Sequence, residues 1–150
     1  MINTLYKFLY SRETAPNAKG EDNERALQLA TAALLMEVAS ADHHISDDER
    51  NTIRSIVEEK YSISADEAMA IAHRAEQDTK HNTSLYPFTR MINAELSLEE
   101  RVEIVSMLWR VTAADGHIDA HEQHLVRKIA DLLYVPHSQF IRTRLQHDGR

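Results

Sequence analysis

The chain has no cysteine among its 150 residues, and only three glycines and three prolines. Without cysteine it has no disulfide, thiol nucleophile, thiolate metal site or CxxC redox pair. No apolar run approaches the roughly 18 residues that a membrane-spanning helix requires. The N-terminal sequence also lacks the small-residue cleavage site of a signal peptide. We therefore expect a cytoplasmic protein without an integral membrane segment.

Positive charge is in the minority, with 17 Lys and Arg against 24 Asp and Glu and a net charge of −7. Nucleic acid is not an expected partner, because binding phosphates requires clustered Lys and Arg. No Gly-rich phosphate loop, nucleophile elbow or HExxH motif is present, so we predict no catalytic residue. We expect a protein partner instead, and a chain that is either a monomer or a homodimer.

Apolar residues recur at steps of three and four, as in the stripe Leu27, Ala30, Leu34, Val38 and Ala41. This period is typical of amphipathic helices, and no segment alternates with the period of a strand. Four residue pairs of the type Ser/Asp-x-x-Glu mark helix starts. The pattern predicts helices over 24–42, 47–60, 65–79, 85–95, 98–115, 120–134 and 136–147, with a short additional helix over 2–10. Residues 1–23 are predicted to be a short segment and a polar tether, and 24–150 the helical domain.

The sequence contains an internal repeat at a shift of 73 residues, which places 35–49 over 108–122. Matched identities include Leu35/Leu108, Val38/Val111, Ala41/Ala114, Asp42/Asp115, His44/His117, Ile45/Ile118 and Glu49/Glu122, with a thinner match continuing to Tyr61/Tyr134. Each half is predicted to contain three helices, and the halves to pack about an approximate two-fold axis. The expected fold is all-α, a single compact bundle of about seven or eight helices built from two pseudo-repeated three-helix halves.

The shared core of the repeat is Asp-x-His-Ile-x-x-x-Glu, at a helix end, a loop and the next helix start. It resembles the A-D-G-x-I-x-x-x-E motif found in both halves of the tellurite resistance protein B-like (TerB-like) family. Residues 114–122 fit this motif fully, whereas the first copy has His43 where glycine is usual. The resemblance covers roughly residues 24–146, and it implies an all-helical domain linked to tellurite resistance and related stress responses.

Asp42 and Asp115 are the acids that helix capping does not explain, because both are predicted at helix C-termini, where the macrodipole disfavours negative charge. One interpretation is a divalent cation, Ca²⁺, Mg²⁺, Mn²⁺ or Zn²⁺, held by carboxylates of both halves. The expected ligands are Asp42, Glu49, Asp115 and Glu122, with Asp119 and His117 as weaker candidates. The motif matches the last eight positions of an EF-hand loop. The earlier ligand positions fall on residues without carboxylates, which excludes a complete EF-hand.

Two other interpretations remain open at this point. The two helix–loop–helix junctions that contain the repeated motif can form an acidic surface for a protein partner, made by Asp42, Asp47, Asp48, Asp115 and Asp119. Alternatively, Glu49 and Glu122 are only the glutamates of capping boxes begun by Ser46 and Asp119, with Gly116 ending the preceding helix. We expect a non-catalytic interaction scaffold that uses the acidic surface, with the divalent-cation protein as the alternative.

Overall fold

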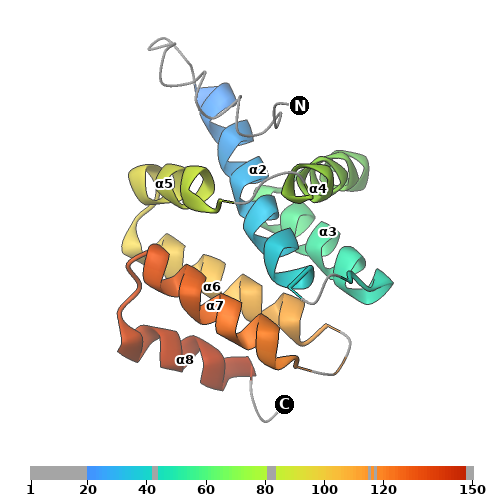
Figure 1. Ribbon diagram of the computed structural model, residues 1–150. Helices are drawn as coiled ribbons and strands as arrows, with labels where there is room; N and C mark the ends of the chain where they lie inside the picture. Colours follow the sequence, from blue (N-terminus) through green and yellow to red (C-terminus); the bar gives the residue numbers. More distant parts are fainter. Residues whose placement is uncertain (1–19, 42–43, 81–83, 115, 117, 148–150) are drawn as a thin grey trace.

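Seven α-helices form the regular structure of the residues that the computed structural model describes, which are 20–41, 44–80, 84–114, 116 and 118–147 (Figure 1). They are α2 (Gly20–Ala39), α3 (Asp47–Tyr61), α4 (Ala65–Thr79), α5 (Tyr86–Glu95), α6 (Leu98–Thr112), α7 (Ala120–Leu132) and α8 (His137–His147). The all-α class is therefore confirmed. The predicted helix over 2–10 lies outside the described residues.

Three helix starts follow directly from local sequence. Ser46, Ser64 and Ser97 each accept a hydrogen bond from the backbone N–H of the glutamate three positions later, at 3.0, 3.1 and 3.2 Å. Each glutamate carboxylate accepts in return from the serine N–H, which completes the capping box. Helices α3, α4 and α6 consequently begin at the predicted residues.

Other helix boundaries differ from the prediction. Helix α2 begins at Gly20 rather than at residue 24. Helix α6 ends at Thr112 rather than at 115, and α7 at Leu132 rather than at 134. Sequence periodicity alone does not show where a turn replaces the last helical residues.

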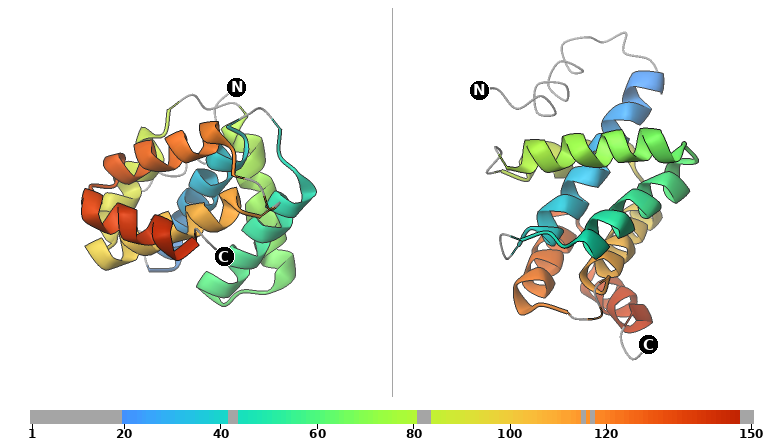
Figure 2. Two further views of the ribbon diagram at one scale, coloured as in Figure 1. Left: turned by 90° about the horizontal axis from the view of Figure 1, so that it is seen from below. Right: turned by 90° about the vertical axis from the view of Figure 1, so that its right-hand side faces the viewer.

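Helix α2 passes through the centre of the molecule, with the other helices around it (Figures 1 and 2). It packs against α3, α4, α5, α6 and α7. Every residue from Leu29 to Met36 is buried, so the predicted single apolar stripe is too narrow. A helix buried on all sides is apolar all round, and the alanines Ala30, Ala32 and Ala33 allow the neighbouring helices to approach closely.

The two halves of the repeat are α2–α3–α4 and α6–α7–α8, and α5 connects them. The N-caps Ser46 and Asp119 are 73 residues apart. The left-handed residues that end α3 and α7, Ser62 (φ 54°) and Tyr134 (φ 56°), are only 72 apart. The second copy is thus one residue shorter within α7, and the structural counterpart of Tyr134 is Ser62, so the sequence pairing of Tyr61 with Tyr134 is wrong.

None of the helices in the described part of the chain is both long and apolar enough to cross a membrane.

Candidate functional site

The first corner, residues 40–50, links α2 to α3. Here Ser40 Oγ donates a hydrogen bond to the Glu37 carbonyl oxygen at 3.2 Å. Glu49 is 4% exposed, and its Oε1 accepts from the Ser46 N–H at 2.9 Å. At least one oxygen of this predicted metal ligand therefore has a structural role. Asp42 and His43 lie outside the described residues.

Two acids of the first corner face solvent. The Asp47 side chain is 94% exposed, and its Oδ1 lies 3.3 Å from Nη1 of Arg50. Asp48 is exposed and, among the described residues, makes no hydrogen bond or salt bridge. We call Asp47 and Asp48 the acidic rim. Both belong to the predicted partner surface, and neither carboxylate is used to cap α3.

The second corner, residues 113–123, links α6 to α7 and differs in its carboxylates. Asp119 Oδ1 accepts from the backbone N–H of His121 at 2.6 Å and of Glu122 at 3.4 Å, and these hydrogen bonds lower the pKa of Asp119. Glu122 is 3% exposed. Asp119 is therefore an N-cap, as the structural interpretation predicted. At the positions of Asp47 and Asp48 in the repeat, this corner has Ala120 and His121.

Gly116 has a φ of +77°, as expected for a left-handed glycine, but it lies three residues beyond the Ala113 C-cap of α6. It shapes the loop and does not end the helix, so its predicted place next to the helix end is wrong. The acid before it, Asp115, and the following His117 both lie outside the described residues.

The predicted metal ligands are only partly covered by the structure. Within the described ranges, no group of three or more His, Asp or Glu side chains is arranged to hold a metal ion. Glu49, Glu122 and Asp119 are described, whereas Asp42, Asp115 and His117 are not. A shared cation site consequently stays a prediction that depends on Asp42 and Asp115.

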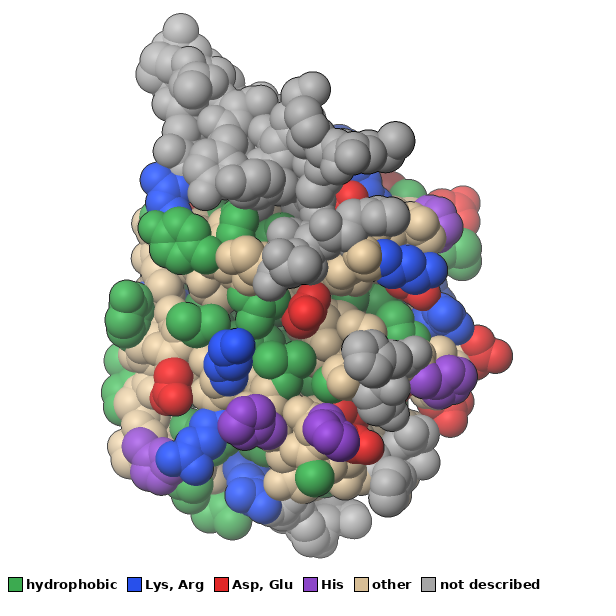
Figure 3. All heavy atoms as spheres, viewed as in Figure 1, with side chains coloured by type: hydrophobic (Ala, Val, Ile, Leu, Met, Phe, Trp, Pro, Cys, Tyr) green, Lys and Arg blue, Asp and Glu red, His purple; other side chains and the backbone are tan. Residues whose placement is uncertain are grey.

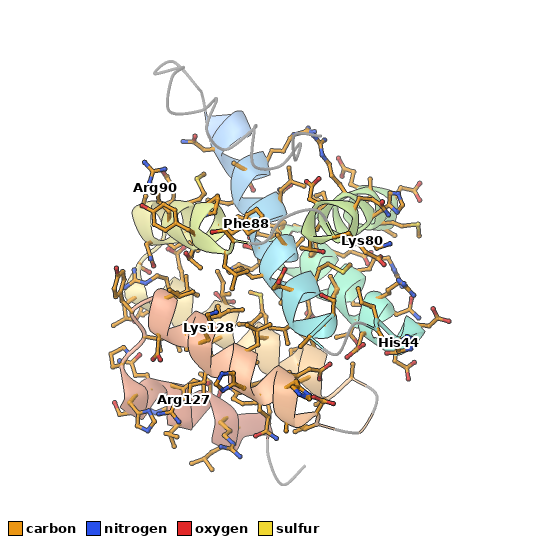
Figure 4. All side chains as sticks on the ribbon, viewed as in Figure 1. His44, Lys80, Phe88, Arg90, Arg127 and Lys128 are labelled. Carbon is orange, nitrogen blue, oxygen red and sulfur yellow. The ribbon has the colours of Figure 1, made fainter. Side chains whose placement is uncertain are left out.

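A cavity of about 650 Å³ adjoins the first corner, and sequence analysis did not predict it. Its lining is mostly polar and comes from the end of α2, the corner, the start of α3 and the end of α4; it comprises Glu37, Ser40, His44, Ile45, Arg50, Glu76, Thr79 and Lys80. Figure 4 shows His44 and Lys80 on one side of the lower half of α2, and Lys128 of α7 on the other side.

Arg50 and Glu76 form a two-bond ion pair in the cavity wall. Arg50 Nε donates to Glu76 Oε1 at 3.2 Å, and Nη2 donates to Oε2 at 2.9 Å. The Glu76 side chain is only 9% exposed, and the hydrogen bonds from Arg50 lower its pKa. This pair joins α3 to α4 across 26 positions of sequence. No local pattern in the sequence indicates it.

Glu37 lies in the last turn of α2 and differs from Glu76. Burial raises the pKa of Glu37, and Lys128 opposes this shift through its charge. Over the part of the chain that the structure describes, the Glu37 carboxylate has no hydrogen bond or salt bridge. The sequence could have indicated that Glu37 is unusual, because it is the one charged residue between Ala26 and Ala41.

The surface around these groups is not of one sign. On the face seen in Figure 3, Lys, Arg and His side chains predominate over α7 and α8, whereas acids and bases alternate along the edge formed by α3 and α4. Among the described carboxylates of the first corner and the adjoining cavity, Asp48 and Glu37 make no hydrogen bond or salt bridge, whereas Asp47 and Glu76 pair with Arg50.

The fold and its corners define an all-α domain made of two three-helix halves, each with an acidic motif between its first two helices. The family model described as tellurite resistance protein TerB matches residues 28–145, and the chain belongs to this family. It is a module of the tellurite-resistance type. Neither a curated protein nor a solved structure matches the chain significantly.

Proposed function

We propose that this TerB module is a non-catalytic scaffold that recruits a basic protein partner through the acidic surface of its corners. The observation that carries the proposal is the acidic rim, since Asp47 and Asp48 are exposed while Asp119 and Glu49 are used in helix caps. Asp42 and Asp115 are expected to extend this surface.

The helix dipole accounts for the stability of acids in the first turn of α3, but it leaves their outward charge available. Exposed carboxylates of this kind increase the association rate and the specificity for a partner of opposite charge. Their effect is screened by salt over about 8–10 Å at physiological ionic strength. The proposed association is therefore strongly dependent on ionic strength.

The test is affinity recovery of partners by the immobilised chain, quantified by mass spectrometry. We expect Asp47→Asn/Asp48→Asn and Asp42→Asn/Asp115→Asn each to reduce recovery of the principal basic partner at least fivefold. The control is Asp66→Asn/Glu99→Gln, which removes two exposed acids from the first turns of α4 and α6. Equal recovery with all three variants would reject the proposal.

The alternative is a divalent-cation protein, and one observation favours it. Both motif glutamates, Glu49 and Glu122, are buried at equivalent positions of the two corners, and carboxylate oxygens are ligands that divalent cations bind. Oxygen ligands of this type suit Ca²⁺, Mg²⁺ or Mn²⁺, and carboxylate–histidine sets suit Zn²⁺. Calorimetry on chelator-stripped protein tests each ion. Binding heat that Asp42→Asn/Asp115→Asn abolishes would support this alternative, and no heat with any ion would reject it.

A further inference from the structure

The cavity beside the first corner lies where three helix termini meet. Helices α2 and α4 end there, and α3 begins there. The C-terminal end of a helix has the equivalent of about half a negative charge, so two of the three termini favour a cation. The acidic rim belongs to the same corner, since Asp47 pairs with the cavity residue Arg50.

The cations in the cavity wall do not satisfy Glu37. Arg50 is bonded to Glu76 and Asp47, and both acids contribute to the raised pKa of its guanidinium. Lys80 is exposed at the end of α4, and Lys128 interacts with Glu37 only through its charge. A partly buried carboxylate without a hydrogen bond carries a desolvation cost that no protein donor offsets. A donor from outside the chain would remove this cost.

We propose that this cavity is the anchor pocket for a lysine or arginine side chain of the partner protein, with the Glu37 carboxylate as its acceptor. The inference rests on the proposed function, because the rim that attracts a basic partner adjoins the pocket. An anion is disfavoured next to Glu37, since the carboxylate without a hydrogen-bonding partner repels it; Arg50 and Lys80 line other parts of the same cavity. An apolar side chain would leave Glu37 and Ser40 facing a desolvated surface.

The probe is a decapeptide with three lysines separated by glycine and serine, titrated into the ¹⁵N-labelled full chain at low ionic strength. Matched peptides have arginine or norleucine at the same three positions, and spermidine is a fourth ligand. We expect the lysine and arginine peptides to shift the amide signals of Glu37, Ser40 and Glu76. The norleucine peptide is expected to leave these signals unchanged.

Variants identify the acceptor. Glu37→Gln is expected to weaken lysine-peptide binding roughly tenfold, as loss of a charge-assisted hydrogen bond does. Lys128→Gln is expected to strengthen it, because this change removes the competing charge next to Glu37. Asp66→Asn is the control without effect. Because burial disfavours the charged form of Glu37, the neutral Gln variant is expected to fold, which circular dichroism checks.

The outcomes separate this inference from the proposed function. If Asp47→Asn/Asp48→Asn abolishes partner recovery while Glu37→Gln leaves peptide binding unchanged, the anchor pocket is rejected and the acidic scaffold remains. Signal changes confined to the rim would also reject the pocket. Tighter binding of spermidine than of the lysine peptide at Glu37 would assign the pocket to a free polyamine and overturn the inference.

Discussion

At the scale of single residues, Glu37 and Glu76 show how one cavity holds two carboxyl groups whose pKa values shift in opposite directions. Glu76 accepts two hydrogen bonds from Arg50, which favour its ionised form, and its pKa is lowered. The main influence on Glu37 is burial, which disfavours the ionised form and raises its pKa. A charged group kept at a cost in stability is typical of a functional site, which is why the proposed anchor is Glu37 and not Glu76.

The Arg50–Glu76 pair predicts a dependence of stability on pH. The folded pKa of Glu76 lies below its ordinary value of 4.5. The pair is thus fully stabilising above pH 4.5, and its contribution is lost as the pH falls through the lower folded pKa. We expect Glu76→Gln to lower the free energy of unfolding at pH 7 by roughly 1–3 kcal/mol. The difference from the wild type is expected to shrink below pH 4.5.

Urea unfolding at pH 7, 5, 4 and 3 measures this difference. The control is Glu99→Gln, which neutralises an exposed glutamate in the first turn of α6. If the difference in free energy of unfolding between the wild type and Glu76→Gln stays constant down to pH 3, the ionic origin of the stabilisation is contradicted.

At the scale of secondary-structure elements, the ends of α3 and α7 share one turn. The Ile63 N–H donates to the Glu58 carbonyl at 3.3 Å, and the Val135 N–H donates to the Ala130 carbonyl at 3.0 Å. These bonds, with a left-handed residue between, form the Schellman motif that ends many helices. Glycine is usual at the left-handed position, yet here it is Ser62 in one half and Tyr134 in the other.

Tyr134→Gly is expected to stabilise the chain. A residue with a side chain destabilises the folded state by about 1–2 kcal/mol when its backbone is in the left-handed region. Glycine avoids this cost, but its greater conformational entropy in the unfolded chain lowers the stability by about 0.4–1 kcal/mol. Tyr134 is 74% exposed, so little packing is lost. The predicted net gain is about 0.5–1 kcal/mol, measured by urea unfolding.

Ser62→Gly is the matched change in the first half, and we expect it to raise the free energy of unfolding as well. A loss of 1 kcal/mol or more in the Tyr134 variant alone would show that the tyrosine ring makes a stabilising contact.

At the scale of the whole molecule, we expect the burial of α2 to join the two halves into one cooperative unit. This helix belongs to the first half but packs on α6 and α7 of the second. The Trp109 side chain in α6 is buried, and its Nε1 donates to Thr143 Oγ1 of α8 at 3.1 Å. The fluorescence of Trp109 therefore reports on the second half.

Leu34→Ala in α2 tests this cooperativity. Removing a fully buried leucine is expected to cost about 2–5 kcal/mol, and Leu34 is 0% exposed. We expect the transitions detected by Trp109 fluorescence and by circular dichroism to coincide and to shift together. The control Leu145→Ala, at a side chain that is 61% exposed, should change the stability by less than about 0.5 kcal/mol. A Trp109 transition that does not move would show that the halves unfold independently.

The local features of this protein follow from its amino-acid sequence without knowledge of the fold. Its serine–glutamate pairs predict the starts of α3, α4 and α6, because a capping box consists of contacts between residues three apart. The repeated motif likewise predicts two similar halves and the family. Other features depend on residues far apart in sequence and are seen only in the folded chain: the burial of α2 on all sides, the Arg50–Glu76 pair and the cavity around Glu37. The hydrogen-bonding state of each corner acid also depends on the fold, because folding decides which backbone N–H groups and side chains lie beside each carboxylate.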